Sequence, residues 1–366
     1  MCLAAVKQKD SNLFRTTISY SHEIEVYKPI LPGLPDDIAK YCLALVAWHH
    51  FPVVGCVCKK WRSVVQSNEF SIIRKHARKL EERIYFLCSD KEGKGSHWEV
   101  FTSSGHQQTL LPMPGPAKAA FGVVTLDSKI LVMGGYIVNE GPNKISADVY
   151  QYDCRLNRWS TLAKMNVARC DFASAEVDGL VYVVGGYGAD GQNLPTAEAY
   201  DPGQDKWTLI GSMRSPRWGS FAFSFDGKLY VMGGRSSFTI GNSRFIDVYD
   251  PKCGSWSEMK NGRGMVTTHA VLQKRLFCME WKNPRRLYVF NPAKNSWKVI
   301  QVPVTGSSCA GFRLGILDGK LLLFSTGEEP GYQTLTYDLD AAPGSEWVTS
   351  SLTPPWSCLY SVTIKA

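Results

Sequence analysis

The apolar positions follow a helical period between residues 34 and 83, after a mixed, polar stretch at 1–29 without any sustained period. They form three stripes with spacings of three and four residues, which are typical of amphipathic helices. The stripes are Ile38, Tyr41, Cys42, Leu45 and Val46, then Val54, Val57, Cys58, Trp61 and Val65, and last Phe70, Ile73, Ala77 and Leu80. We therefore expect a mobile tail followed by a small helical module, which is too short to be stable without a neighbour or a partner.

From Ile84 onward the pattern changes to that of extended strands, and it repeats. Apolar and β-branched runs follow turn pairs such as Asp178-Gly179 and Asp226-Gly227, as strands do. Five units then carry a Tyr-Asp-like pair and a lone tryptophan, and these tryptophans lie 41 to 50 residues apart. The pairs are Tyr152-Asp153, Tyr200-Asp201, Tyr249-Asp250, Phe290-Asn291 and Tyr337-Asp338, and the tryptophans are Trp159, Trp207, Trp256, Trp297 and Trp347. Such a period indicates units that must stack to bury a core, as solenoid repeats or propeller blades.

The β-rich region has the length of six such units. The units run roughly over 84–112, 115–165, 166–213, 214–259, 263–303 and 307–353, and a strand at 357–364 has no unit of its own. Because closure removes exposed sheet edges, we predict that this last strand completes the first unit of a closed ring. The fold class is then a small all-α module (30–70) with a connecting helix (71–83), followed by an all-β six-bladed propeller (84–366).

Composition narrows the functional classes. The chain has 366 residues, 44% of them hydrophobic, but no apolar run long enough to span a membrane and no secretory signal. Its eleven cysteines are scattered. Cys56 and Cys58 are close together, but no second Cys or His pair lies at the spacing that a zinc site requires. We expect no metal, no membrane and a reducing compartment, which is the cytoplasm, the nucleus or both.

The net charge of +8 is concentrated in residues 59–83, which hold eight Lys/Arg against three Glu. A basic stripe can bind nucleic acid, or it can be a solvated helix face or a surface that matches an acidic protein. No nucleic-acid-binding motif accompanies the charge, so we expect no nucleic-acid partner.

Catalytic signals are weak. Residues 186–191 satisfy G-x-G-x-x-G after a strand, but the next segment contains a proline and another strand instead of the helix that a dinucleotide site needs. There is no Gly-x-Ser-x-Gly elbow and no paired-carboxylate signature. We expect a non-catalytic protein without a cofactor.

The repeats resemble the kelch-repeat family of β-propellers. Three units carry its strand-terminal diglycine, at Gly134-Gly135, Gly185-Gly186 and Gly233-Gly234, whereas the fifth has Phe277–Glu280 at this position and the sixth has Ser325–Gly327. Some kelch-type propellers are copper oxidases, but only His97, His106 and His269 lie in this region, without an ordered His/Tyr set. The resemblance therefore implies a binding module.

The helical module resembles an F-box, in LPDDIAKYCLAL at 34–45 and VCKKWRSVVQSNEF at 57–70. It departs from the family at Gly55-Cys56, where an Arg is common. The resemblance implies that helices of a SKP-type adaptor, and through it a cullin, complete the apolar faces. The implied adaptor-binding residues are Leu34, Pro35, Ile38, Leu43, Val57 and Trp61. The same residues could instead merely hold the helices together.

Kelch propellers commonly recognise ligands through loops at one end of the ring. The implied substrate-binding residues at that end are Lys118, Tyr136, Arg169, Tyr187, Arg217, Arg235 and Arg263. Cations with aromatic neighbours suit an acidic peptide or loop. Alternatively, each cation braces its own blade by bonding backbone carbonyls.

The order of the two modules resembles the plant F-box/kelch-repeat proteins. It implies a substrate-recognition subunit of an SCF-type E3 ubiquitin ligase, which binds a protein targeted for ubiquitination and proteasomal degradation. In plants such targets include metabolic enzymes and signalling regulators. The alternative is a kelch scaffold outside any ligase, whose helical module binds something else.

Overall fold

The computed structural model describes residues 28–89, 95–138, 144–236, 243–280, 282–303, 311–326, 333–354 and 357–365. Four α-helices come first, and the rest of the described chain is almost entirely β-strand. The tail predicted at 1–29 lies outside these residues except for Lys28 and Pro29. No helix in the described ranges is both long and apolar enough to cross a membrane.

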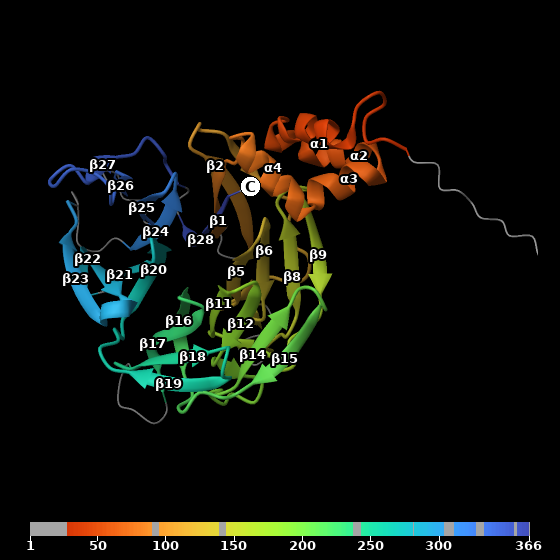
Figure 1. The fold of residues 1–366 in the computed structure, drawn as a ribbon. Helices are drawn as coiled ribbons and strands as arrows, with labels where there is room; N and C mark the ends of the chain where they lie inside the picture. Colours follow the sequence, from red (N-terminus) through yellow and green to blue (C-terminus); the bar gives the residue numbers. More distant parts are fainter. Residues whose placement is uncertain are drawn as a thin grey trace, which may run out of the picture.

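Six four-stranded antiparallel sheets surround a central axis and form the predicted propeller (Figure 1). We name each blade by its place in the ring. Blade 1 is β28 (Cys358–Lys365), β1 (Glu82–Ser89), β2 (Ser96–Thr102) and β3 (Gln107–Thr109); blade 2 is β5 (Gly122–Leu126), β6 (Lys129–Met133), β8 (Val149–Asp153) and β9 (Arg158–Leu162); blade 3 is β11 (Ala173–Val177), β12 (Leu180–Val184), β14 (Ala197–Asp201) and β15 (Lys206–Ile210). Blade 4 is β16 (Trp218–Phe225), β17 (Lys228–Arg235), β18 (Ile246–Asp250) and β19 (Ser255–Met259); blade 5 is β20 (Val266–Leu272), β21 (Arg275–Glu280), β22 (Asn283–Asn291) and β23 (Ser296–Gln301); blade 6 is β24 (Phe312–Leu317), β25 (Lys320–Ser325), β26 (Leu335–Tyr337) and β27 (Trp347–Thr349). A 3-10 turn, η3 (Pro292–Lys294), joins β22 to β23.

The closing strand is the one that the sequence predicts. β28 pairs with β1 from Glu82 opposite Lys365 to Cys88 opposite Cys358. The ring is therefore shut by hydrogen bonds between the last strand of the chain and the first strand after the helices.

The turn pairs make tight hairpins between the first two strands of a blade. Asp178 and Gly179 both have positive φ, at 49° and 83°, and the residues before and after them are directly paired. Two left-handed residues in a two-residue loop match the twist of the flanking strands, and Asp226-Gly227 and Asp318-Gly319 repeat the geometry. This explains the Asp-Gly spacing of the repeat.

The Tyr-Trp spacing has a cross-strand origin. In blade 3, Tyr200 lies directly opposite Trp207, and their ring centroids are 5.1 Å apart. Blades 2, 4, 5 and 6 repeat this aromatic pair at 4.7 to 5.2 Å. In blades 2 to 5 the indole N–H also donates to a carbonyl of the linker that arrives from the preceding blade, at 2.5 to 2.9 Å. The tryptophan therefore fastens the outer strand to the incoming chain.

The diglycine allows one blade to approach the next. Gly185 has φ 70°, and a Cβ on it would lie 2.5 Å from the carbonyl oxygen of Arg217 in the following blade. Gly186 donates its N–H to the same oxygen at 2.7 Å. Any side chain at Gly185 would clash with this backbone, and positive φ is costly for other residues. The pair is thus a contact point between blades.

The helical module consists of α1 (Asp36–Ala44), η1 (Trp48–His50), α2 (Phe51–Val57), α3 (Lys59–Gln66) and α4 (Asn68–His76). The second predicted stripe is two helices, because Cys58 is extended (φ −160°, ψ 166°) and its Sγ accepts from the N–H of Trp61. The connecting helix predicted at 71–83 also differs: α4 ends at His76, Arg78 has φ 55°, and β1 begins at Glu82.

The helices share one hydrophobic core with blades 1 and 2, against which they lie in Figure 1. The cluster joins buried residues of the helices to buried residues of the strands, among them Phe51, Val65, Phe70, Tyr85, Trp98, Tyr152 and Ile364. The helical module is therefore stabilised by packing against the propeller of the same chain, as its small size requires.

Two residues of the basic stretch are buried at this junction. Arg74 is 1% exposed, and its Nη1 donates to the carbonyls of Ala44 and Val46 at 2.8 and 2.9 Å. Burial lowers the pKa of Arg74 to about 10, so it stays charged. The guanidinium carbon of Arg83 lies 4.5 Å from the Trp48 ring centre. The expectation of a solvated helix face or a surface open to an acidic protein is thus incorrect for these two residues.

Arg155, in the turn between β8 and β9, joins the helices to the propeller. Its Nη1 donates to the carbonyls of Val65 and Ser67, each at 3.0 Å, and its Nη2 contacts the Ser71 hydroxyl. Nothing in the sequence distinguishes Arg155 from other turn residues, because the contact exists only after the two modules pack.

Replacing Arg155 by alanine is expected to lower the free energy of unfolding by about 2 to 3 kcal/mol, because buried carbonyls lose a charged donor. Urea unfolding of the full chain measures the change, and hydrogen exchange should quicken in α3 and α4. Arg158→Ala, at an exposed neighbour, should shift stability by less than about 0.5 kcal/mol. Equal effects of the two substitutions would contradict the role of Arg155.

Candidate functional site

The first candidate surface is a pair of exposed apolar rows on α1 and α2. Ile38 and Tyr41 lie on α1, Leu34 and Leu45 continue its helical spacing just beyond its two ends, and Val53 and Val57 are one turn apart on α2. All six are among the exposed large hydrophobic residues, and Val53 and Val57 are 67% and 58% exposed. An apolar face left open in this way is typical of a protein-interaction site.

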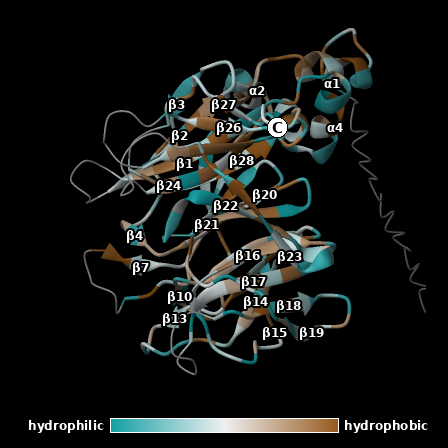
Figure 2. Cartoon of the chain, turned by 90° about the vertical axis from the view of Figure 1, so that its left-hand side faces the viewer, coloured by the Kyte–Doolittle hydropathy of each residue, from teal (hydrophilic) through white to brown (hydrophobic). Residues whose placement is uncertain are grey.

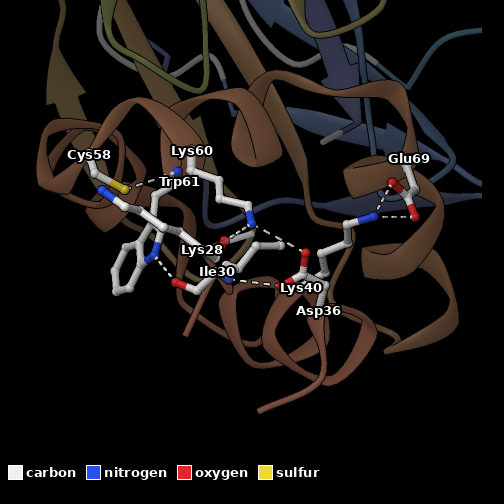
Figure 3. Close-up of polar contacts among 8 residues, drawn as sticks. All are labelled: Lys28, Ile30, Asp36, Lys40, Cys58, Lys60, Trp61 and Glu69. Carbon is white, nitrogen blue, oxygen red and sulfur yellow. Dashed lines mark hydrogen bonds and ion pairs between the residues drawn. The ribbon is translucent and has the colours of Figure 1, made fainter. Parts of the chain in front are cut away.

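Polar contacts fix the segment that leads into this surface (Figure 3). Asp36 accepts from the N–H of Ile30 at 2.8 Å and pairs with Lys60 at 3.4 Å. The Trp61 indole N–H donates to the Ile30 carbonyl at 2.7 Å. Lys40, on the other side, pairs with Glu69 at 2.7 Å. These contacts hold residues 28–36 against α3, so that Leu34 and the exposed Pro35 are presented at the start of α1.

The structure separates the six residues predicted for adaptor binding. Leu34, Pro35, Ile38 and Val57 are exposed, whereas Leu43 is only 4% exposed and belongs to the core shared with blades 1 and 2. Leu43 is therefore a packing residue, because helical spacing turns it inward together with Ala39. Trp61 is half-buried against the same core, so only part of its ring can meet a partner. Tyr41, Leu45 and Val53 were missed as candidates, although their helical spacing could have identified them.

The second candidate surface is the end of the propeller away from the helices. The short sheets β4 (Lys118–Ala119) with β7 (Tyr136–Ile137) and β10 (Arg169–Cys170) with β13 (Tyr187–Gly188) lie there. In Figure 2 they are at the left edge, opposite α1 and α4. We call this end the distal face.

Three of the seven residues predicted to bind a target are buried braces. Arg169 is 0% exposed; its Nη1 donates to the Gly185 and Thr196 carbonyls, and its Nη2 pairs with Glu198 at 2.9 Å. Arg217 pairs with Asp247 at 2.6 Å in the same way. Burial lowers the pKa of both arginines, while their carboxylate partners raise it.

Lys118 makes the corresponding contacts in blade 2. Its Nζ donates to Ser146 at 2.9 Å and pairs with Asp148 at 3.2 Å, and burial lowers its pKa. The hydrogen bonds of Lys118, Arg169 and Arg217 are made within their own blades. The alternative interpretation as braces therefore holds for these three, and their side chains are not open to a target.

The other four predicted residues retain accessible surface. Tyr187 lies 4.9 Å from Trp218, ring centre to ring centre, and the Arg235 guanidinium lies 5.6 Å from the same tryptophan. Trp218 thus joins two predicted residues and was itself missed, although it directly follows the brace Arg217. Tyr136 is half-buried in the β4–β7 pair. Arg263 stands apart, 24% exposed, and pairs with Glu280.

A cavity of about 530 Å³ opens at the centre of the ring between the first strands of the six blades. Phe121, Phe221 and Tyr360 are on its wall, and His269 faces Phe221 at 4.3 Å. His269 is accessible from the cavity but enclosed by protein, which together with nearby Arg313 lowers its pKa to about 4. The imidazole is thus neutral at physiological pH, and the wall combines these aromatic rings with polar side chains such as Asp171 and Arg313.

One group of side chains has the composition of a metal site. Ligand atoms of Cys88, His97 and Glu99 lie within 4.8 Å of one another in blade 1. However, His97 Nε2 is hydrogen-bonded to Glu99 Oε1 at 3.0 Å. Burial also raises the pKa of the Cys88 thiol well above its usual range. A thiol must lose its proton to bind a metal, so its burial makes Cys88 a costly ligand. Cys56 and Cys58 are exposed and belong to no such group among the described residues.

Comparisons with known proteins agree with this architecture. Residues 120–327 match the KLHDC2/KLHL20/DRC7 Kelch-repeats domain family. An F-box/kelch-repeat protein of Arabidopsis thaliana is 56% identical over 92% of this chain and 90% of its own length. A second from the same plant is 40% identical over 92% of this chain and 97% of its own length. A third is 29% identical over about half of each chain, at 53% and 52%.

Proposed function

Because this chain belongs to the plant F-box/kelch-repeat family, we propose that it is the substrate-recognition subunit of an SCF-type E3 ubiquitin ligase. Its F-box would bind a SKP-type adaptor and, through it, a cullin. Its propeller would hold a target protein for ubiquitination and proteasomal degradation. Family membership supports the general role, and two opposed surfaces on a helical module and a propeller that share one core fit it physically.

The observation that carries the proposal is the open apolar face of the F-box. Ile38 and Val57 are 47% and 58% exposed, although Leu43 and Phe51 of the same helices are buried. The core of the helices is thus completed by the propeller, and these rows remain for another protein. Burying them would contribute about 25 cal/mol for each Å² of apolar surface removed from water.

The chain would contribute position and no bond chemistry. A target held on the distal face meets the ubiquitin-loaded enzyme at a high effective concentration, which replaces a bimolecular encounter. We expect the complex to act in the cytoplasm, the nucleus or both, and a metabolic enzyme or a signalling regulator is the expected kind of target.

Val57→Asp and Ile38→Asp test the proposal. Each places a charge on the open apolar face, so each should weaken binding to a purified SKP-type adaptor by about a hundredfold, or about 2.7 kcal/mol. Calorimetric titration of the full chain measures the affinity. The melting temperature should stay unchanged, because both residues are exposed in the free protein.

Val348→Asp is the matched control, because Val348 is 56% exposed on a propeller strand. It should bind the adaptor like the unmodified chain. If all three variants bound equally well, or if the unmodified chain did not bind the adaptor, the ligase proposal would fail. A kelch scaffold outside any ligase would then be the better description.

A further inference from the structure

A cavity of about 820 Å³ lies where blades 4 and 5 meet, apart from the central cavity. Its walls come from the loop before β18, the linker between β19 and β20, the end of β21 and the tryptophan of β23. We call it the seam pocket. Its charged and large apolar side chains are Arg244, Phe245, Lys260, Arg263, Met265, Glu280, Lys282 and Trp297.

The seam pocket occurs where blade 5 departs from the pattern of blades 3 and 4. In blades 3 and 4, the residue two positions before the tyrosine that faces the tryptophan is acidic and binds the brace arginine: Glu198 precedes Tyr200, and Asp247 precedes Tyr249. In blade 5 the corresponding residue, two positions before Phe290, is Tyr288. The buried carboxylate is therefore missing in this blade.

In the absence of that carboxylate, Arg263 contacts two aromatic rings and a different carboxylate. Its guanidinium carbon lies 3.6 Å from the Tyr288 ring centre and 4.8 Å from that of Trp297, and it pairs with Glu280 at 2.8 Å. Glu280 occupies the register position of the first glycine of the diglycine. Arg263 is 24% exposed, against 0% for Arg169 and 2% for Arg217. Arg263 is therefore accessible to a ligand, unlike the two brace arginines.

Three further cations line the seam pocket. Arg244, Lys260 and Lys282 are exposed, and none of them has an ion pair within the part of the chain that the structure describes. Glu280, the one carboxylate of the lining, is already held by Arg263. The pocket thus carries a net positive charge of three. Phe245 and Met265, 38% and 37% exposed, add apolar surface beside the cations.

We propose that the seam pocket binds an acidic segment of the target protein, in which carboxylates flank an apolar side chain. Free lysine and arginine donors match carboxylates through charge-assisted hydrogen bonds. Phe245 and Met265 would receive the apolar side chain, because aromatic and thioether groups adapt to different partners. The inference rests on the proposed function and adds to it the chemical class of the target segment.

A nucleic acid is the other polyanion that four cations could attract. A strand of RNA or DNA needs a groove of cations that follows its backbone, with open aromatic faces for the bases. Here the cations surround one pocket, and Arg263 and Phe290 already contact the Trp297 ring. The geometry therefore favours a peptide.

Binding of two labelled peptides to the complete chain in complex with its adaptor tests the inference. One peptide alternates Asp and Glu with Leu, and the other has Asn and Gln in place of the acids. Fluorescence anisotropy should detect the acidic peptide alone, with an affinity that falls as salt rises. Lys260→Glu with Lys282→Glu should weaken its binding by about tenfold or more, since two charged donors are lost.

Lys206→Glu with Lys252→Glu is the control, because both residues are exposed on the propeller outside the pocket and the net charge changes equally. It should leave the affinity within about twofold. Equal losses in both pairs, or no binding of the acidic peptide, would overturn the inference. So would tighter binding of an oligouridine that depends on Lys260 and Lys282. Adaptor titration of the same proteins is independent of the pocket, so loss of peptide binding with intact adaptor binding would leave the proposed function standing.

Discussion

Replacing Arg169 by methionine is expected to lower the free energy of unfolding by about 3 to 5 kcal/mol, because Glu198 then keeps a buried charge without its counter-ion. Both side chains are 0% exposed. Glu198 also accepts from the N–H groups of Asn166 and Val167 at 2.7 and 3.0 Å, so it cannot turn toward solvent without releasing the chain before Arg169. Urea unfolding of the full chain measures the loss.

A double-mutant cycle separates this pair from simple loss of packing. Arg169→Met combined with Glu198→Leu should cost clearly less than the sum of the single substitutions, since it leaves no unpaired charge. Arg214→Met, at an exposed arginine, should change stability by less than about 0.5 kcal/mol. Strict additivity, or a single-variant cost below about 1 kcal/mol, would show that the ion pair is not a brace.

Removing β28 by ending the chain at residue 354 is expected to have the largest effect of all. β1 would keep β2 but lose its other partner strand along nearly its whole length, and blade 1 would expose an unpaired edge. The loss should exceed about 5 kcal/mol, which is comparable to the total stability of many domains. Differential scanning calorimetry should show no cooperative transition, and the shortened chain should self-associate.

Supplying the strand in trans tests whether pairing is the cause. A peptide of residues 357–365 should restore a melting transition that depends on its concentration, whereas the same peptide with aspartate at Ile364, which is 2% exposed, should not. A shortened chain that remained monomeric and melted at the original temperature would mean that the ring does not need this closure.

Much of the fold could be predicted from the sequence because its signals are local. Asp178-Gly179 specifies a two-residue turn, and the seven-residue spacing from Tyr200 to Trp207 specifies a hairpin that brings the two rings together. Because the pattern recurs in successive blades, it indicates the number of units. The final strand, which has no unit of its own, is then expected to complete the first blade. The break at Cys58 was missed, because the apolar spacing runs through it without interruption.

The candidate site was harder to predict, since the same residue type at the same turn can brace a blade or face a ligand. Arg169, Arg217 and Arg263 occupy equivalent positions in their blades. Whether each is buried depends on the residue two positions before the aromatic residue in the third strand that faces the tryptophan. Glu198 and Asp247 bury their arginines, whereas Tyr288 leaves Arg263 accessible. This signal is present in the sequence. Arg155, in contrast, could not have been found before the packing of the modules was known.

The position of Ile364 has a consequence for how the protein is made. It belongs to the last strand of the chain and to the core that supports the F-box helices. During translation the helices leave the ribosome long before Ile364, which completes the core that supports them. Nascent chains that end before β28 would therefore lack part of the core under the helices, and with it a firm base for the exposed apolar rows on α1 and α2.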